Sequence, residues 1–444
     1  MKKPSLAKGT RDFLPLQANR RKFIFQTIES VFKNYAYQAL ETPAMENLST
    51  LTGKYGDEGD KLLFKIVNSG DYLKDAPEEF VQEKNSNKLL PFISEKGLRY
   101  DLTVPFARVV AMNQNSIHFP FKRYQIQPVW RADRPQRGRY REFYQCDADV
   151  VGSNSLLYEA ELIQIYDQVF STLKIPVNIV FNHRKILEGV ASQAGCIDQF
   201  MNMTLELDKL DKIGPEEVKK NLMQLGIAAD QADWILKITA SDNLEDFNFN
   251  ELAIHGKNEL QKILAFNSNY SYGQTLKFSA SLARGLSYYT GCIFEVLPTT
   301  VKMGSLGGGG RYDNLTEVFG LPDVSGVGIS FGADRIYDVL EEQNLFPIEI
   351  SQAVRALFIS LDEACLQVAF ECAGSIRSFG IPVEVYPEPT KIKKQFSHAE
   401  KLAVPYVIII GEEERQSHTA LVKNQFTGVQ ERVSFDMLAN YIAQ

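Results

Sequence analysis

The stretch FKRYQIQPVWRADRPQRGRYREFYQCDADVV, residues 121–151, indicates the fold of this chain more clearly than any other part of it. Its two ends, from about 121 to 131 and from 140 to 151, are rich in apolar and aromatic residues, and the polar segment ADRPQRGR lies between them. Runs of this kind around a polar connection are typical of neighbouring strands. We therefore predict a strand, a loop and a second strand.

Polar side chains alternate along both predicted strands. Successive side chains of a strand point to opposite faces, so each strand has one polar face. The residues on these faces are Arg123, Gln125, Gln127 and Arg131 in the first strand and Arg141, Gln145 and Asp149 in the second. Facing polar groups of this kind can form the floor of a site for a charged ligand. The pattern alone equally fits a hairpin whose polar face lies in solvent.

Arginines crowd the connecting loop. Arg134, Arg137 and Arg139 lie within it, and Arg131 and Arg141 bracket it. Planar guanidinium groups bind phosphates through paired hydrogen bonds, so this loop is suited to hold a nucleotide and an RNA end beside the site. A solvated run of charge is the alternative that the loop by itself leaves open.

The segments around this unit predict further elements of the same fold. Residues 19–37 place apolar side chains at helical spacing, which predicts an amphipathic helix, and Pro43 then predicts an edge strand or an interruption. Residues 183–269 show short helical patterns and few strand signals, which predicts a mainly helical insertion. Strand-like alternation returns over 274–297, and GVGISF, 326–331, predicts a strand followed by a helix.

A separate domain is predicted beyond Pro347. The strand-like runs LFIS, PVEVY and YVIIIG alternate with two helical stretches, and this order is the βαβαβ pattern of an α/β domain. A chain of 444 residues also exceeds what one hydrophobic core usually organises. Typical domain sizes therefore predict about three domains.

Composition limits the class of protein. Apolar residues make up 44% and charged residues 23%, as in ordinary globular domains, and no run approaches the roughly 18 apolar residues of a membrane span. The start lacks an apolar leader segment, so we expect a cytoplasmic protein. The net charge of -7 argues against a general polyanion binder, which means that any RNA contact is local. Five scattered cysteines without a C-x-x-C pair suit buried thiols, and we expect no metal site made by the protein alone.

Two further arginines lie at informative positions. Arg335, in GADRIYDVL, lies in the first turn of a predicted helix, where the helix dipole disfavours a cation. Stacking on an adenine or contact with a γ-phosphate would account for it, and a surface arginine paired with Asp338 or a nearby acid is the alternative. Arg284, in LARGLSYYTG, precedes Tyr288 and Tyr289, whose rings and hydroxyls can line a pocket for a small polar ligand.

A glycine cluster, GGGGRYD at 307–313, lies just before the strand GVGISF. It does not match G-x-x-x-x-G-K-[ST] and has no lysine at the required position, so it does not predict a P-loop. Close packing of the backbone explains it adequately.

Taken together, five segments resemble the class II aminoacyl-tRNA synthetases and, within that family, the histidyl-tRNA synthetase branch. The segments are KGTRDFLP for the N-terminal signature, LETPAME for motif 1, FKRYQIQPVWRADRPQRGRYREFYQCDADVVG for motif 2, GVGISFGADR for motif 3 and LARGLSYYTG for the histidine-specific segment. The resemblance runs nearly end to end, and five motifs in order at sensible spacing leave little room for chance.

The resemblance implies an α+β catalytic domain with an antiparallel sheet, a helical insertion and a C-terminal α/β domain that binds the anticodon. We expect the first part of the catalytic domain over 1–183, the insertion over 184–270, the second catalytic part over 271–345 and the anticodon-binding domain over 351–444. A homodimer is implied as well, because the first helix and the strand near Pro43 resemble the motif 1 interface of the family.

Matching motif positions imply roles in adenylate formation. Arg131 would hold the α-phosphate of ATP and the substrate carboxylate, Arg284 would stabilise the α-phosphate from the opposite side, and Arg335 would clamp ATP. Such preorganised cations lower the barrier, because carboxylate attack on the α-phosphorus builds negative charge on its oxygens. ATP is expected to enter with Mg2+, which bridges the leaving pyrophosphate.

The same resemblance implies a pocket for histidine. The α-ammonium group would be received by Asp101, Thr103 and Gln145, and the two imidazole nitrogens by Asp149 and Tyr289, with Tyr288 beside them. A carboxylate that faces the imidazole is the expected discriminator.

The loop of motif 2 and two departures complete the implied site. Arg134, Gln136 and Arg137 are expected to contact the acceptor end of the tRNA. Ser287 stands where many relatives have aspartate, and Asp334 stands where many have glutamate. Neither is a principal ligand of the family, so the expected activity is unchanged.

These expectations together predict a cytoplasmic ligase that has no membrane partner. It would activate L-histidine with ATP to histidyl-adenylate and pyrophosphate, and then transfer histidine to the 3′-terminal ribose of tRNA(His). The alternative is a noncatalytic synthetase paralogue that serves as a regulatory subunit in histidine biosynthesis. Such paralogues resemble only the catalytic core, whereas this chain retains Arg131, Arg284, Arg335 and the C-terminal α/β domain.

Overall fold

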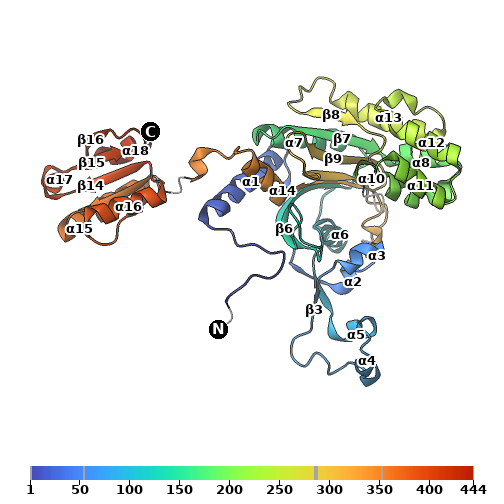
Figure 1. The fold of residues 1–444 in the computed structure, drawn as a ribbon, viewed down its shortest axis with the longest axis horizontal. Helices are drawn as coiled ribbons and strands as arrows, with labels where there is room; N and C mark the ends of the chain where they lie inside the picture. Colours follow the sequence, from blue (N-terminus) through green and yellow to red (C-terminus); the bar gives the residue numbers. More distant parts are fainter. Residues whose placement is uncertain (1–2, 54–55, 285–288, 352–353, 444) are drawn as a thin grey trace. The chain divides into compact units, whose positions relative to one another are not determined.

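The computed structural model describes residues 3–53, 56–284, 289–351 and 354–443 (Figure 1). The chain forms two compact units, one of Met1–Asp12 with Ile24–Leu345 and the other of Phe13–Phe23 with Phe346–Gln444. Within the parts described, no helix is both long and apolar enough to cross a membrane. The narrower domain limits predicted from the sequence remain predictions.

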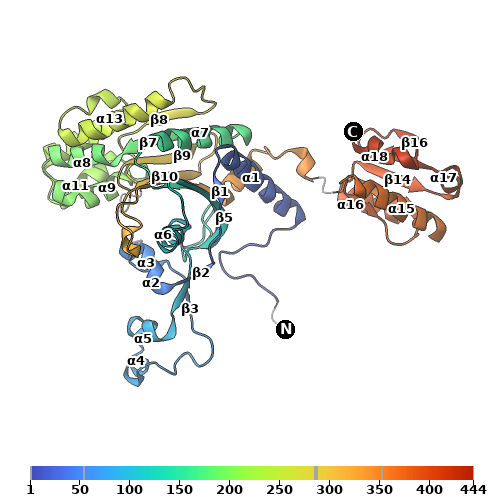
Figure 2. The same ribbon diagram turned by 180° about the vertical axis from the view of Figure 1, so that it is seen from behind.

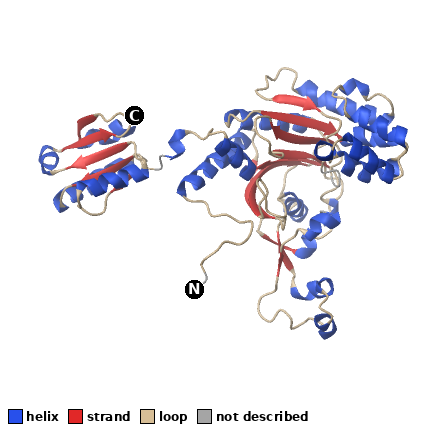
Figure 3. Ribbon diagram, in the orientation of Figure 1, coloured by secondary structure: helices blue, strands red, loops and turns tan. Residues whose placement is uncertain are grey.

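An eight-stranded sheet forms the centre of the first unit, as Figures 1 and 3 show, with the order β1-β5-β6-β11-β10-β9-β7-β8. The bounds are β1 Gln38–Ala39, β5 Phe121–Trp130, β6 Glu142–Val151, β11 Gly326–Gly332, β10 Gly307–Tyr312, β9 Cys292–Pro298, β7 Val177–His183 and β8 Thr275–Phe278. β1 pairs with β5 and β8 pairs with β7 in parallel, and the other neighbours in this sheet are antiparallel. The predicted α+β fold with an antiparallel sheet is confirmed.

The strand pair predicted from residues 121–151 is β5 and β6. The two strands pair over their whole length, from Phe121 opposite Val151 to Trp130 opposite Glu142. Their polar face is buried, since Arg123 is 0% and Asp149 is 3% exposed. The alternative of a hairpin with a solvated polar face is therefore wrong, because other parts of the unit cover this face.

The glycine cluster forms β10, a strand between β11 and β9. A Cβ atom on Gly309 would lie 2.1 Å from the carbonyl oxygen of Gly328, and one on Gly310 would lie 2.7 Å from that of Cys292. We explained the glycine cluster of the sequence by close packing of the backbone, and this explanation is confirmed. The strand itself was not predicted, because glycine is a weak strand former.

Helices cover both faces of the large sheet. α7 (Leu157–Thr172) packs against β7 and β11, and α14 (Ala333–Glu342) packs against β6 and β11. α6 (Thr103–Met112) lies inside the curve of the sheet in the two opposite views of Figures 1 and 2. The predicted amphipathic helix is α1 (Pro15–Asn34), and it buries Ile24 and Ile28.

The chain near Pro43 is interrupted, as predicted. β1 ends at Ala39, and the next strand, β2 (Met45–Asn47), belongs to a separate three-stranded sheet with the order β2-β4-β3. The other elements of this region are β3 Lys65–Ile66, β4 Lys96–Leu98, α2 Leu48–Leu51, α3 Gly56–Lys61, α4 Glu78–Gln82 and α5 Ser86–Ile93.

The segment predicted as a helical insertion is helical between β7 and β8. Its α-helices are α8 Arg184–Gln193, α9 Phe200–Leu207, α10 Leu210–Ile213, α11 Pro215–Gln224, α12 Ala229–Thr239 and α13 Glu251–Phe266. α13 packs against α8 and α7, which joins this layer to the sheet.

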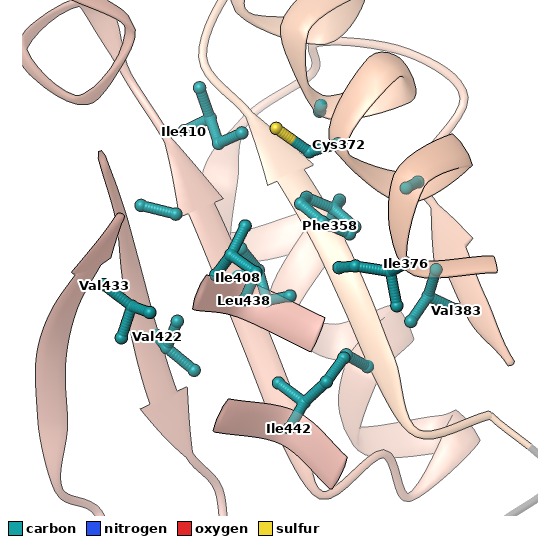
Figure 4. Close-up of a cluster of buried hydrophobic side chains, with 14 of the residues drawn as sticks. Phe358, Cys372, Ile376, Val383, Ile408, Ile410, Val422, Val433, Leu438 and Ile442 are labelled. Atoms are coloured by element: carbon teal, nitrogen blue, oxygen red, sulfur yellow. The ribbon is translucent and has the colours of Figure 1, made fainter. Parts of the chain in front are cut away.

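The second unit has a five-stranded sheet with the order β13-β12-β14-β15-β16. The predicted βαβαβ part is β12 Ala356–Ser360, α15 Glu363–Ser378, β13 Val383–Val385, α16 Ile392–Leu402 and β14 Tyr406–Ile410. It continues into α17 Glu412–Ser417, β15 Thr419–Asn424, β16 Gln430–Ser434 and α18 Leu438–Ala443, with β15 and β16 antiparallel. Figure 4 shows its own apolar core, in which Phe358, Ile376 and Ile408 lie between the sheet and its helices.

Candidate active site

A cavity of about 470 Å³ lies in the first unit, and β6, β10, β11 and the start of α14 contribute to its walls. Eight of the site residues predicted from the sequence line it, namely Asp101, Thr103, Arg131, Gln145, Asp149, Arg284, Tyr289 and Arg335. Tyr288 lies outside the described residues. The fold therefore brings together residues that are far apart in the sequence.

Asp149 lies on the floor of the cavity in a nearly water-free environment. Its Oδ2 atom forms an ion pair with Nη2 of Arg123 at 2.8 Å, and its Oδ1 atom accepts a hydrogen bond from the hydroxyl of Tyr312 at 2.6 Å. Burial raises the pKa of the Asp149 carboxyl above its usual range, and the guanidinium of Arg123 opposes that rise. The side chain is held from two sides and has a fixed orientation.

Asp147, two residues before Asp149 on the same face of β6, also lines the cavity and is 2% exposed. Burial raises the pKa of its carboxyl to about 7, with Arg123 acting to lower it and Asp149 to raise it. Asp147 is not among the site residues that the sequence motifs predict. The alternation placed its side chain on the polar face, but that pattern carries no information on its pKa.

Arg131 lies at the edge of the cavity, just after β5. Its Nε atom donates to the carbonyl oxygen of Tyr100 at 3.1 Å, and its Nη2 atom donates to Oε1 of Gln145 at 3.3 Å. The amide nitrogen of Gln145 donates to Oγ of Ser330 at 2.9 Å. Gln145 therefore joins the arginine to the neighbouring strand, β11.

Asp101 and Thr103 are placed at the start of α6. The Oδ1 atom of Asp101 accepts a hydrogen bond from the backbone nitrogen of Val104 at 3.1 Å, and α6 begins at Thr103. An acidic side chain that accepts a backbone N–H in the first turn is a common way to begin a helix. The same turn directs both residues to the cavity.

Several guanidinium groups gather at the cavity. Arg335 donates from Nε to the carbonyl oxygen of Gly138 at 2.8 Å and from Nη1 to that of Ser305 at 2.6 Å. Burial lowers the pKa of Arg335, and the positive charges of Arg284, Arg139 and Arg131 lower it further. Cations that repel one another in this way favour a bound polyanion.

The alternative partner of Arg335, Asp338, is engaged elsewhere. Its Oδ2 atom accepts a hydrogen bond from the hydroxyl of Tyr140 at 2.9 Å, and its Oδ1 atom lies 3.7 Å from Nη1 of Arg11. The interpretation of Arg335 as a surface arginine paired to Asp338 is therefore wrong. Its hydrogen bonds to two backbone carbonyls hold it at the cavity instead.

The chain matches known families and proteins. The family described as histidyl-tRNA synthetase matches residues 93–336, and the family described as anticodon binding domain matches residues 353–444. The chain is 50% identical to the histidine–tRNA ligases of Phocaeicola vulgatus and Cytophaga hutchinsonii, over 98% of this chain and 98% of each relative. The chain belongs to the histidyl-tRNA synthetase family.

Solved structures of the histidyl-tRNA synthetase family have the same fold. The crystal structure of the enzyme from a Nostoc species superposes with a TM-score of 0.85 at 27% identity and covers 100% of this chain and 99% of its own. A Bacillus halodurans protein described as an ATP phosphoribosyltransferase regulatory subunit/histidyl-tRNA synthetase superposes with a TM-score of 0.71 at 18% identity. At that identity only the fold is shared.

The N-terminal signature of the histidyl-tRNA synthetases contacts motif 2 and motif 3 in this member. Arg11 forms an ion pair with Asp334, and its guanidinium lies 3.5 Å from the ring centre of Tyr140. Asp334 also accepts a hydrogen bond from the backbone nitrogen of Tyr144 at 2.9 Å. Asp334 of motif 3 thus contacts both the N-terminal signature and motif 2, while the departure at Ser287 lies outside the described residues.

Arg284 and Tyr289, from the histidine-specific segment, flank the undescribed residues 285–288. Arg284 is half exposed and forms an ion pair with Glu295 of β9. The ring of Tyr289 lies against β10, because a Cβ on Gly310 would be 2.9 Å from its Cδ1. The predicted ligands of the α-phosphate and the imidazole therefore lie on walls of one cavity.

The motif 2 loop reaches the surface. Arg134, Gln136 and Arg137 are exposed and do not belong to the described lining of the cavity, and Arg137 forms an ion pair with Glu342 at the end of α14. Arg139, by contrast, does line the cavity. The tRNA contact and the solvated charge run therefore both remain interpretations of this loop.

Proposed function

We propose that this chain activates L-histidine with ATP and transfers it to the 3′-terminal ribose of tRNA(His). One observation carries the proposal. Two residues of β6 line the cavity at different points along the strand. Gln145 accepts a hydrogen bond from Arg131, and Asp149 is ion-paired with Arg123. A ligand with a carboxylate at one end and an imidazole at the other matches this order of charges.

The arginines carry the adenylation step in this proposal. Arg131 holds the histidine carboxylate against the α-phosphate, Arg284, which is ion-paired with Glu295 of β9, approaches the α-phosphate from the opposite side, and Arg335 clamps the remainder of ATP. One carboxylate oxygen attacks the α-phosphorus, the bond to the bridging oxygen breaks, and pyrophosphate leaves with its electron pair. Fixed guanidinium groups stabilise the negative charge that grows on the nonbridging oxygens without having to reorganise.

Histidine is selected at the opposite end of the cavity. Asp149 accepts a hydrogen bond from one imidazole nitrogen, and Tyr289 contacts the other. Asp101, Thr103 and Gln145 receive the α-ammonium group, and Tyr288 is a further candidate for the pocket. An amino acid without a donor that faces Asp149 would lose this hydrogen bond in a nearly water-free pocket, which lowers its affinity.

ATP is expected to enter with Mg2+. The guanidinium-lined part of the cavity fits a triphosphate, and Mg2+ is commonly held by phosphate oxygens and water rather than by a protein cage. When bound, the ion supplies charge neutralisation for the leaving pyrophosphate. We assign no protein ligand to it.

The second unit is proposed to bind the anticodon of tRNA(His), with Arg134, Gln136 and Arg137 at the acceptor end. The family match over 353–444 supports this division of labour. We also propose that the enzyme is a cytoplasmic homodimer. Sedimentation at micromolar concentration tests the dimer, and a monomer would contradict it.

The noncatalytic regulatory paralogue is less well supported. Full-length relatives at 50% identity are described as histidine–tRNA ligases, and an anticodon-binding domain follows the catalytic region. A regulatory subunit of histidine biosynthesis has no need of the arginines Arg131, Arg284 and Arg335 in one cavity.

Pyrophosphate exchange across all standard amino acids tests the proposed activity. Histidine alone should support exchange of labelled pyrophosphate into ATP. Charging of tRNA(His) should then require the same protein and the same amino acid. Equal exchange with another amino acid would contradict the assigned specificity, and no exchange with any would favour the regulatory paralogue.

A further inference from the structure

Two buried carboxylates share one guanidinium on the floor of the cavity. Arg123 is fully buried, pairs with Asp149 at 2.8 Å, and is also the principal cation acting on Asp147. Arg123 lies opposite Asp149, and the neutral Gln125 lies opposite Asp147, in the register of β5 and β6. When both carboxyls are ionised, this group of three side chains has a net charge of -1 by counting one cation against two anions.

The elements packed around Asp147 add little positive charge. β11 presents Ser330 to it. Tyr166 of α7 interacts with Asp147 electrostatically, and its hydroxyl donates to the carbonyl oxygen of Ser330 at 3.2 Å. Asp101, before α6, adds a second negative charge to its surroundings. Arg99 also interacts with Asp147 electrostatically, but its hydrogen bonds go to oxygens of other residues, including the carbonyl of Pro128 at 2.8 Å.

Asp147 also constrains the orientation of an amide that is proposed to bind the substrate. Nε2 of Gln145 donates to Oδ1 of Asp147 at 3.4 Å and to Oγ of Ser330 at 2.9 Å, while Oε1 accepts from Arg131. An ionised carboxylate only accepts hydrogen bonds, so it favours the amide nitrogen on its own side. The amide oxygen then faces Arg131, on the side where the α-ammonium group is proposed to bind.

We propose that Asp147 is a further positioning residue of the histidine pocket, which holds the Gln145 amide and supplies the negative charge that balances the α-ammonium group of histidine. The inference rests on the proposed function, because it requires histidine in this cavity. It assigns to Asp147 a role that the motif positions did not include.

A proton balance follows from this role. Burial raises the pKa of Asp147 to about 7, so the ligand-free pocket retains a proton on this carboxyl in about half of the molecules at neutral pH. A bound ammonium group favours the ionised carboxylate and lowers its pKa. Histidine binding therefore expels that proton to the buffer, at most about half a proton per site at pH 7.

Isothermal titration calorimetry of the full-length protein measures this release. L-Histidine is titrated at pH 7 in two buffers that differ in ionisation enthalpy, and the difference in heat gives the number of protons released. The imidazole of histidine exchanges protons near the same pH. Both the wild type and Asp147→Asn bind the same ligand, so the difference between their proton releases excludes the protons exchanged by the imidazole of histidine.

Asp147→Asn keeps the size of the side chain but loses its charge. We expect its dissociation constant for histidine to rise about tenfold, the scale of a lost charge-assisted interaction, and its proton release to fall by up to about half a proton. The dissociation constant for ATP should change by less than about twofold, because the affected group faces the amino acid. Asp147→Ser is a second variant that also removes the charge.

Asp167→Asn is the matched control. Asp167 is another buried carboxylate of the first unit, but it accepts hydrogen bonds from the backbone of Gln274 at 2.7 Å and from Tyr270 at 3.0 Å, away from the cavity lining. The Asp167→Asn variant should therefore have the same affinity for histidine and the same proton release as the wild type.

The outcomes separate the inference from the proposed function. Wild-type protein that binds histidine but shows the same proton release and affinity as Asp147→Asn overturns the role of Asp147 alone. This comparison needs only one folded variant, which either Asp147→Asn or Asp147→Ser can supply. Wild-type protein that binds another amino acid in place of histidine overturns both.

Discussion

Replacement of Arg123 by methionine should make the stability of the first unit depend on pH. Arg123 is the guanidinium shared by Asp149 and Asp147, and its side chain also lies 4.3 Å from the ring centre of Phe106. Methionine keeps much of the apolar packing against that ring, so the main loss is the charge. Two buried carboxyls then remain without their principal cation.

The size of the effect follows from this arrangement. Removing one partner of a buried ion pair typically costs about 3–5 kcal/mol of the free energy of unfolding, because the other charge stays buried. The native pKa of both carboxyls is already raised in the wild type, and the loss of Arg123 raises it further. A carboxyl with a raised native pKa contributes stability at low pH that is lost as the pH rises through that pKa.

The slope of stability against pH differs between the two proteins above pH 7. Asp147 of the wild type, with a pKa of about 7, has lost most of its proton there, so its contribution levels off. Arg123→Met retains a proton in the native state to higher pH and should lose up to about 1.4 kcal/mol per pH unit for each proton retained. The deficit relative to the wild type therefore grows between pH 7 and pH 9.

Urea unfolding monitored by tryptophan fluorescence measures this deficit. The chain has two tryptophans, Trp130 and Trp234, and both belong to the first unit, so the signal reports that unit. Arg108→Met is the matched control, because Arg108 pairs with the single carboxylate of Glu46 at 2.8 Å. An equal slope with pH in both variants, or wild-type stability of Arg123→Met at pH 8, would refute the reasoning.

Three further predictions concern catalysis and RNA. Arg284→Ala should slow adenylate formation by about 100-fold, the usual cost of losing one donor to a developing charge, as measured by rapid-quench single turnover. Asp149→Asn should raise the KM for histidine by roughly tenfold to a hundredfold and leave the dissociation constant of ATP nearly unchanged, because the lost charge faces only the imidazole. Deletion of residues 351–444 should impair tRNA charging much more than pyrophosphate exchange, since the proposed adenylation residues all lie in the first unit.

Each of these predictions has its own contradicting result. Single-turnover chemistry of Arg284→Ala at the wild-type rate would exclude a role in the transition state. Equal losses of affinity for histidine and ATP in Asp149→Asn, measured by calorimetry, would remove its assignment to the imidazole. For the deletion, both reactions are measured on one preparation whose folding and dimer state are checked, and equal losses would mean that the second unit stabilises the fold.

Local sequence patterns were sufficient to predict individual strands, because the residues of one strand are close together in the sequence. Strict alternation predicted β5, β6 and their polar faces, because side chains on a strand alternate whatever lies around it. The apolar runs after Pro347 predicted β12, β13 and β14 for the same local reason. Motif positions identified eight residues of one cavity, although no pattern in the sequence shows how close they lie.

Burial and long-range partners required the tertiary structure. Arg11 and Asp334 are separated by 323 positions, and Arg335 is held by the carbonyls of Gly138 and Ser305, so no local pattern predicts either arrangement. The raised pKa of Asp147 depends on the elements that exclude water from β6 and on one guanidinium from β5. Periodicity determines which face a side chain occupies, whereas its charge state depends on the solvent and the charges that the folded chain leaves around it.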